Sequence, residues 1–264
     1  MGKFSGLSRM GFKTGIVYRA HFFVSLIKIP LTLVVFFYLW RSIFMFSGEE
    51  IIQGYTFAEM FIYYVLSMLV ETLIYCDVDA WMNEGIKDGD VVGDFLRPVT
   101  YMKQLFCQYF GLRELTFLIE VIPIMVVSLF FLNVPLPSLL FGMLFILAVF
   151  LAILLNYFFT FCVGLTAFWL KEIQGIRRVK TAVMAFLEGA LIPLTFFPLI
   201  FQSVFKYLPF QYLRFVPINI FLEKYALSEV VVLLSIQTVW ILIFFFIAKT
   251  VFKLAFRKFA GAGI

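Results

Sequence analysis

The residues that could do chemistry gather in one polar interval, Asp77 to Gln104, of an otherwise very apolar chain. Six carboxylates lie there among three basic side chains: Asp77, Asp79, Glu84, Asp88, Asp90 and Asp94, with Lys87, Arg97 and Lys103. Long apolar runs flank the interval on both sides. A short charged loop in this setting is either a plain solvated connection or a surface on which another protein docks.

Four further ionisable residues lie inside apolar runs: Glu71, Arg113, Glu120 and Glu188. Charged groups within membrane spans are costly and often functional. Glu71 and Glu188 lie at similar distances from the inner ends of their runs, so we expect an interspan pair with Arg113. A proton or cation relay through Glu71 or Glu120 is the alternative to a structural pair or to a residue that faces a transport path.

Motifs for catalysis or metal binding are missing from the sequence. Cys76, Cys107 and Cys162 form no CxxC pair, and His21 is the one histidine. There is no GxSxG nucleophile motif and no GxxxxGK[ST] phosphate loop. We therefore expect no enzymatic activity, no metal and no cofactor on this chain, so any ATP and Mg that it depends on must be bound by a partner. Nucleic acid is not an expected partner.

The composition indicates a membrane protein. The chain has 264 residues, 63% of them hydrophobic, 14% charged and 37 of them phenylalanine, with a mean hydropathy of +1.03. Soluble domains carry about 25% charged residues, and one globular core of this size cannot hide so much apolar surface. We expect an all-α, polytopic membrane protein that forms a single transmembrane domain over residues 1–264.

Six apolar runs are long enough to cross a hydrocarbon core of ~30 Å as helices. They are approximately Phe22–Phe46, Thr56–Cys76, Leu105–Leu132, Leu139–Leu170, Thr181–Val204 and Glu229–Phe252. Residues 1–21 are basic and weakly amphipathic, so we expect an interfacial helix there, with a disordered leader as the alternative.

Orientation follows from the distribution of basic residues. With both termini in the cytoplasm, fourteen Lys and Arg residues lie inside. The outer loops then contain four, namely Arg41, Lys206, Arg214 and Lys224. This bias satisfies the positive-inside rule, and it places the interval 77–104 in the cytoplasm.

Three stretches, spread in order along nearly the whole chain, are similar to those of one family. They are YRAHFF (18–23) with LWRSIF (39–44), GDVVGDFLRPV (89–99) with Tyr101, and IPLTFFP (192–198) with LPF (208–210) and VP (216–217). Together they resemble the type-2 ATP-binding-cassette (ABC) transporter permeases, in the branch of six-span exporter subunits. The middle stretch is the most specific of the three.

The resemblance implies a permease subunit of an ATP-driven exporter in the cell (inner or plasma) membrane. It also implies a separate cytosolic ATPase, a second permease subunit, identical or related, and a path lined by the second and fifth spans. Alternating access would move cargo outward, and the aromatic-rich composition suits a hydrophobic or amphiphilic drug, lipid or peptide. The alternatives are a secondary transporter or channel working without an ATPase and an intramembrane enzyme, although residues 1–132 and 133–264 show no clear repeat.

In such permeases the first cytoplasmic loop holds a coupling helix that seats in a groove of the ATPase, which here would lie within Asp79–Arg97. The local sequence agrees, because Asp88-Gly89-Asp90 is a turn signal, Asp90 can cap a helix through Leu96, and Pro98 ends it. The expected contact residues are Trp81, Glu84, Ile86, Asp90, Val91, Asp94, Phe95, Leu96 and Arg97.

The stretch 205–228 is broken by Pro209 and Pro217 and is rich in aromatic residues. In the family this region forms short helices that enter the outer leaflet and return, so the resemblance implies a re-entrant segment. We expect an outer gate there, formed by Phe205, Tyr207, Phe210, Tyr212 and Phe215. An interfacial helix among the lipid headgroups is the alternative.

Overall fold

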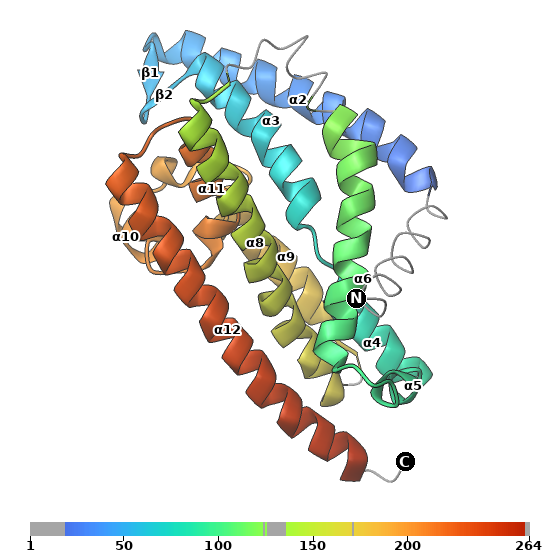
Figure 1. Cartoon of the computed structure of the whole chain (residues 1–264). Helices are drawn as coiled ribbons and strands as arrows, with labels where there is room; N and C mark the ends of the chain where they lie inside the picture. Colours follow the sequence, from blue (N-terminus) through green and yellow to red (C-terminus); the bar gives the residue numbers. More distant parts are fainter. Residues whose placement is uncertain (1–18, 124, 126–135, 171, 262–264) are drawn as a thin grey trace.

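The structure is a computed structural model that describes residues 19–123, 125, 136–170 and 172–261 (Figure 1). Most of the described chain is helical. The interfacial helix expected for residues 1–21 lies outside the described residues, apart from the last three, which begin the first helix. The main helices are α2 (Arg19–Ser47), α3 (Phe57–Ile74), α4 (Val78–Asp88), α5 (Val91–Phe95), α6 (Tyr101–Thr116), α8 (Leu139–Leu165), α9 (Gln174–Leu187), α10 (Leu199–Phe205), α11 (Phe215–Phe221) and α12 (Leu227–Gly261).

A small hairpin marks one end of the bundle, which we call the hairpin end (Figure 1). Strands β1 (Ile51–Ile52) and β2 (Tyr55–Thr56) pair antiparallel, and both turn residues between them have positive φ. Thr56 then caps α3: its Oγ1 accepts from the amide of Glu59 at 3.3 Å, and the Glu59 carboxylate accepts from the amide of Thr56 at 2.8 Å. This reciprocal capping box fixes where the helix begins.

Three helical stretches in the described chain are long and apolar enough to cross a membrane. They are Phe57–Asp88, Leu139–Phe168 and Leu227–Phe256, and a shorter apolar helix covers Leu31–Ser47. The first, second, fourth and sixth predicted runs thus correspond to α2, α3, α8 and α12. The third corresponds to α6, which continues directly into a π-helical turn, η1 (Phe117–Val121).

The prediction of one uninterrupted fifth span over Thr181–Val204 is wrong. Helix α9 ends at Leu187, and the chain then passes through a short 3-10 turn, η3 (Leu194–Phe196), into α10. Gly189 adopts a left-handed conformation (φ +75°). Pro193 and Pro198 have no amide hydrogen to donate to a helical carbonyl, which weakens a continuous helix here and favours the break.

Helix α8 lies at the centre of the packing and contacts α12, α4, α11 and α3. Two buried clusters lie along it. The cluster toward the hairpin end includes side chains of α3 and α11, and the other includes side chains of α4, α6 and α12. A Cβ added at Gly164 of α8 would stand 3.0 Å from the Cα of Asp79, so this glycine is what lets α4 approach so closely.

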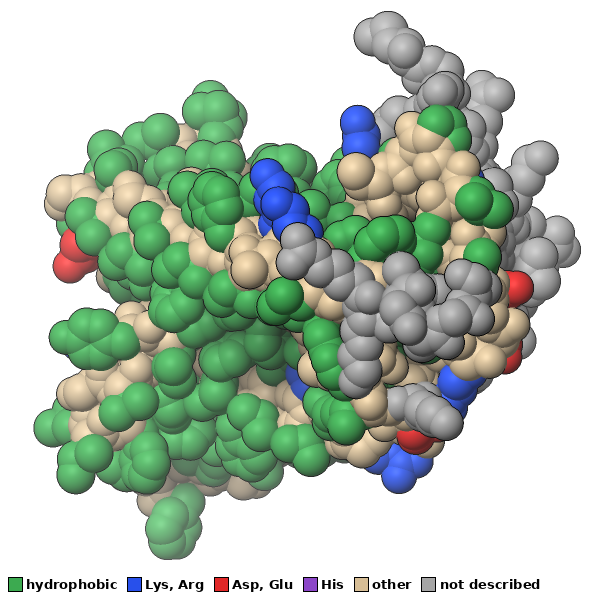
Figure 2. Space-filling model, turned by 90° about the horizontal axis from the view of Figure 1, so that it is seen from below, with side chains coloured by type: hydrophobic (Ala, Val, Ile, Leu, Met, Phe, Trp, Pro, Cys, Tyr) green, Lys and Arg blue, Asp and Glu red, His purple; other side chains and the backbone are tan. Residues whose placement is uncertain are grey.

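The described surface is mainly apolar. In the view from below, hydrophobic side chains cover most of the left-hand part, and most of the charged side chains in view lie toward the right, beside the grey residues (Figure 2). Exposed leucine, valine, isoleucine and phenylalanine recur along α8, α10 and α12. A surface of this kind suits lipid rather than water.

Candidate functional site: two charge clusters joined by one helix

The polar interval folds into two short helices at the end of the bundle opposite the hairpin (Figure 1). Helix α4 ends at Gly89, which adopts a left-handed conformation (φ +79°), and α5 ends just before Leu96. The predicted turn and the predicted short helix are therefore present. Asp90 occupies the N-cap position of α5, but its side chain makes no capping hydrogen bond, contrary to the expectation from sequence.

The apolar side of α5 faces the chain's own core. Val91 is fully buried, and the ring of Phe95 packs against Tyr101 and Phe252 with centroid separations of 5.3 and 6.1 Å. On α4, Trp81 and Ile86 are half-buried. Two of the expected contact residues thus hold the helix pair in place instead of facing outward.

The outward face of α4 and α5 is acidic, with one large apolar side chain. Glu84, Asp88 and Asp90 are exposed, and Leu96 is 82% exposed. Asp94 is half-buried and pairs with the exposed Arg97 at 3.1 Å. Burial raises the pKa of the Asp94 carboxyl, while the nearby Arg97 opposes that rise. We call this face, comprising Glu84, Asp88, Asp90, Leu96 and Arg97, the acidic face.

Ion pairs fasten α4 to α9, and we call this group, made of Asp77, Asp79, Arg177 and Lys180, the clamp. Asp79 is fully buried; Lys180 Nζ donates to it at 2.6 Å, and Arg177 Nε stands 3.1 Å away. Arg177 also bonds Asp77 at 2.9 Å. Two helices far apart in sequence are therefore tied by two carboxylates and two cations.

A second, exposed contact extends the clamp. Lys87 near the end of α4 pairs with Glu172, and the Glu172 carboxylate also accepts from the amide of Gln174 at 3.1 Å at the start of α9. The hydrogen bond from Lys87 lowers the pKa of Glu172, with the Gln174 amide acting in the same direction. Both side chains are exposed to solvent, so this ion pair helps to align α4 with α9 but adds little stability.

The second cluster consists of the buried Glu188 and Arg214 and the exposed Glu71; we call it the arginine cluster. Arg214 Nη2 stands 3.2 Å from Glu188, and Nη1 stands 3.4 Å from Glu71 and 3.3 Å from Ser67 Oγ. The side chains of Arg214 and Glu188 are 8% and 6% exposed, whereas Glu71 is 51% exposed. One guanidinium thus joins α3 to the end of α9.

The prediction that Arg113 pairs with Glu71 and Glu188 is wrong. Arg113 instead donates to the carbonyl of Thr72 at 2.7 Å and lies over the rings of Tyr75 and Tyr109. Arg214 had been assigned to an outer loop, where it would meet water. The sequence feature that could have indicated burial of Arg214 is its position as the only charged residue in the stretch from Phe210 to Phe221. Glu120 lies half-buried in the turn η1.

The backbone break after α9 is held against α3. Tyr63 Oη donates to the carbonyl of Gly189 and Tyr64 Oη to that of Leu191, both at 2.7 Å. The amide of Phe215 donates to the carbonyl of Glu188 at 3.1 Å. These bonds satisfy backbone groups that the end of the helix leaves free. Helix α9 consequently runs from the clamp to the arginine cluster.

The aromatic residues assigned to an outer gate do not share one surface. Phe205, Tyr212 and Phe215 are buried, Phe210 is half-buried, and Tyr207 is 80% exposed. Gln237 of α12 donates to the carbonyls of Tyr212 and of Ala148 on α8, both at 3.1 Å. The 3-10 turn η4 (Phe210–Leu213) and α11 are thus packed into the bundle, halfway along α8.

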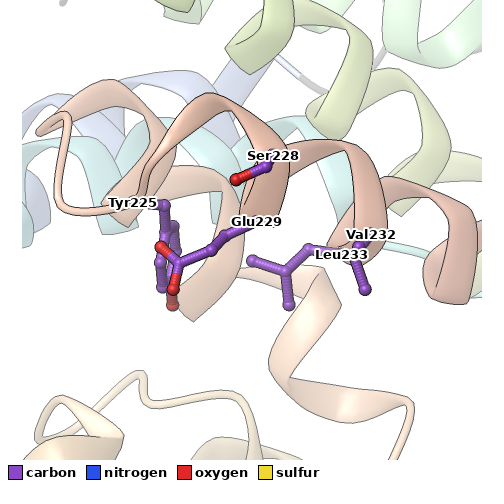
Figure 3. A pocket seen from close by; sticks show the side chains of 5 residues that line it. All are labelled: Tyr225, Ser228, Glu229, Val232 and Leu233. Atoms are coloured by element: carbon purple, nitrogen blue, oxygen red, sulfur yellow. The ribbon is translucent and has the colours of Figure 1, made fainter.

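An open pocket of about 380 Å³ lies where α12 begins, lined by Tyr225, Ser228, Glu229, Val232 and Leu233 (Figure 3). Glu229 accepts from the amide of Ala226 at 2.9 Å, which caps the helix.

Within the part of the chain that the structure describes, no group of three or more His, Cys, Asp or Glu side chains is arranged to hold a metal ion.

Comparison with known proteins gives one positive finding. A family model described as ABC-2 family transporter protein matches residues 15–263. A search of curated proteins found no match. The family match covers both charge clusters and every helix described above.

Proposed function

The chain belongs to the ABC-2 family of transporter proteins, and on that premise we propose that it is the permease subunit of an ATP-driven exporter. ATP is bound and hydrolysed by a separate cytosolic ATPase chain, with its Mg. A second permease, identical or related, completes the transport path. The chain crosses the cell membrane six times, with both termini and the acidic face in the cytosol.

The observation that carries this proposal is the acidic face. A leucine that is 82% exposed among carboxylates has no role in the chain's own core. Protein interfaces combine an apolar centre with a polar rim, and the acidic face has that composition. The helices that present it are fixed from behind by Val91, by Phe95 and by the close approach at Gly164. Because the surface is rigid, a force that a partner applies to it moves α4 and α5 as one unit.

The transport cycle is alternating access. Nucleotide binding closes the two ATPases, which moves α4 and α5 of each permease. The path lies between the permeases and is lined by α3 and by α9 with α10. The stretch 205–228 is re-entrant and forms the outer gate.

Hydrophobic or amphiphilic molecules, such as drugs, lipids or peptides, are the proposed cargo. The described chain exposes an apolar stripe on α9, formed by Ile176, Val179, Val183 and Phe186. These residues recur with helical spacing, so they lie on one face. Helix α10, after the break, also exposes Leu199, Ile200 and Phe201. Apolar walls favour cargo that partitions out of water.

The test is affinity purification of the tagged chain from its native membranes, followed by identification of co-purified chains and an ATP hydrolysis assay. We expect a chain with an ATPase phosphate loop to co-purify. The variant Leu96→Asp should lose it, because a buried interface centre would receive a charge. Leu136→Asp is the matched control, since Leu136 is also exposed (73%) but lies outside the acidic face. Equal ATPase recovery by both variants would contradict the docking site, and transport without ATP would favour a secondary transporter.

A further inference from the structure

We infer that α9 transmits movement from the acidic face to the stretch 205–221, and that Arg214 is the positioning residue at the receiving end. This inference rests on the proposed function and deepens it, since it names the mechanical route inside one permease. Its evidence is the way α9 is held at its two ends and left free between them.

The first end of α9 is held by the clamp. Asp79 belongs to α4, which carries part of the acidic face; its side chain is fully buried, and its Cα and Cβ lie against Gly164. It bonds Lys180 at 2.6 Å and stands 3.1 Å from Arg177. Because two cations one turn apart on α9 share this carboxylate, a displacement of α4 must either pull α9 with it or break both contacts.

Between its ends α9 is almost uncovered by the described chain. Met184 is its one buried residue, and Thr181, Ala182 and Val183 are exposed. A helix of 14 residues is about 21 Å long at a rise of 1.5 Å per residue. A rod anchored at its ends and loosely covered along its length transfers displacement without deforming the core around it.

The second end of α9 is held by the arginine cluster. Glu188 directly follows the helix; its carboxylate bonds Arg214 at 3.2 Å, and its carbonyl accepts from the amide of Phe215. Arg214 and Phe215 open α11. Since Asn219 of α11 accepts from Tyr55 Oη at 2.6 Å, α11 runs from this cluster back to the hairpin end. Movement of Glu188 is therefore passed to α11 through a side-chain contact and a backbone contact.

Arg214 contacts both carboxylates at once, which links the route to α3 as well as to α9. Its Nη1 stands 3.4 Å from Glu71 and its Nη2 stands 3.2 Å from Glu188, and Glu71 is the more exposed of the two carboxylates. Glu71 belongs to α3, which leads directly into α4. A movement of α4 therefore reaches the guanidinium through two helices, by a contiguous network of contacts of the kind that couples distant sites.

The experiment uses the complete transporter, permease and ATPase, in membranes. A cysteine is introduced by Tyr207→Cys, because Tyr207 is 80% exposed between α10 and η4. Its labelling rate with a membrane-impermeant maleimide is measured with and without a non-hydrolysable ATP analogue. Labelling of the parent chain, in which Cys76 and Cys107 are buried and Cys162 is half-buried, is subtracted.

We expect the analogue to change the labelling rate in the Tyr207→Cys chain. The addition of Arg214→Met should abolish that change while ATPase co-purification is retained. The double substitution Arg214→Gln with Glu188→Gln leaves no unpaired buried charge at that pair, so it tests the same point where Arg214→Met fails to fold. Lys224→Met is the control: it removes the ion pair of Lys224 with Glu59, which joins the same region to α3 but does not involve α9. It should keep the nucleotide response.

A nucleotide response that persists in the double variant would overturn the inference. So would the absence of any response in the Tyr207→Cys chain itself. Neither result bears on ATPase co-purification, which depends on the acidic face and tests the proposed function separately.

Discussion

The clamp centres on one buried carboxylate that meets two cations, whereas the arginine cluster centres on one buried cation that meets two carboxylates. In the clamp, the carboxylate of Asp79 meets two cations whose side chains are 27% and 12% exposed. In the arginine cluster, one cation meets two carboxylates, and the arginine and Glu188 are almost sealed from solvent. If Asp79 loses its charge, water can partly hydrate the two cations of the clamp, but if Arg214 is lost, water cannot reach the buried Glu188. Removal of the central charge should therefore cost less at the clamp than at the arginine cluster.

The largest expected effect comes from removing the cation of the arginine cluster. Arg214→Met leaves Glu188 buried and unpaired, so we expect a loss of about 3–5 kcal/mol of folding free energy. Adding Glu188→Met should recover most of it, because a buried ion pair is commonly replaceable by apolar residues. Thermal unfolding of the purified single and double variants measures both. A double variant as unstable as Arg214→Met would show that the two residues do not act as a pair.

At the clamp, the same kind of change should cost less. Asp79→Asn weakens the charge-assisted hydrogen bond from Lys180 and the ion pair with Arg177 but leaves the cations partly hydrated, so we expect a loss of about 1.5–3 kcal/mol. Asp77→Asn is the matched control at a side chain that is one-third exposed, where a loss of at most about 1 kcal/mol is expected. Denaturation of the two variants under identical conditions compares them. Equal losses would mean that burial does not distinguish these two carboxylates.

Substitution of Gly175 and of Gly189 tests how tightly each end of α9 is packed, without a change in any charged residue. A Cβ on Gly189 would stand 2.9 Å from Tyr63 Oη in a left-handed backbone, whereas a Cβ on Gly175 meets nothing within 4 Å. Gly189→Ala should therefore cost about 1–3 kcal/mol, while Gly175→Ala should gain up to about 1 kcal/mol from helix propensity. Melting temperatures of the two variants test this. A stable Gly189→Ala protein would indicate that the break after α9 is loosely held.

The smallest expected effect concerns the exposed Lys87–Glu172 contact and depends on pH. The pKa of Glu172 lies below its usual value of 4.5 because Lys87 and the Gln174 amide bond the ionised form. The stabilisation is therefore present above that usual value and is lost as pH falls through the lowered pKa. Glu172→Gln should lower the melting temperature slightly at neutral pH and not in strong acid. Glu84→Gln, on the exposed side of α4, is the control, and the difference between its melting temperature and that of the parent chain should not depend on pH in this way.

Much of the fold could be predicted from local signals. The apolar runs give α2, α3, α8 and α12 close to their observed limits, because a span of about 20 apolar residues is decided by composition alone. The turn at Gly89 and the short helix before Pro98 were also predictable from residue type. The break after α9 was not predicted, because an interior proline such as Pro193 or Pro198 can either kink or break a helix, and the packing of this segment against α3 decides which.

The candidate site was predicted less well. The polar interval was identified, but Val91 and Phe95 were predicted to contact a partner, whereas Val91 is buried and the half-buried Phe95 packs against Tyr101. Residue type says that α5 has an apolar side and does not say whether that side faces the core or a partner. Arg214 was assigned to solvent because it lies in a Pro-broken stretch, and the clamp cations Arg177 and Lys180 were counted only as topology signals.

The sequence by itself determined that this chain is a helical membrane protein, where its long helices run and where its charges are concentrated. These properties depend on composition and on neighbours a few residues apart. Only the tertiary structure decided which charge meets which. Asp79 and Lys180 are separated by 101 residues along the chain, and Glu71 and Arg214 by 143. Ion pairs depend on depth and distance in space, and these are set by how α8 and Gly164 bring α4 close and how the broken end of α9 folds against α3.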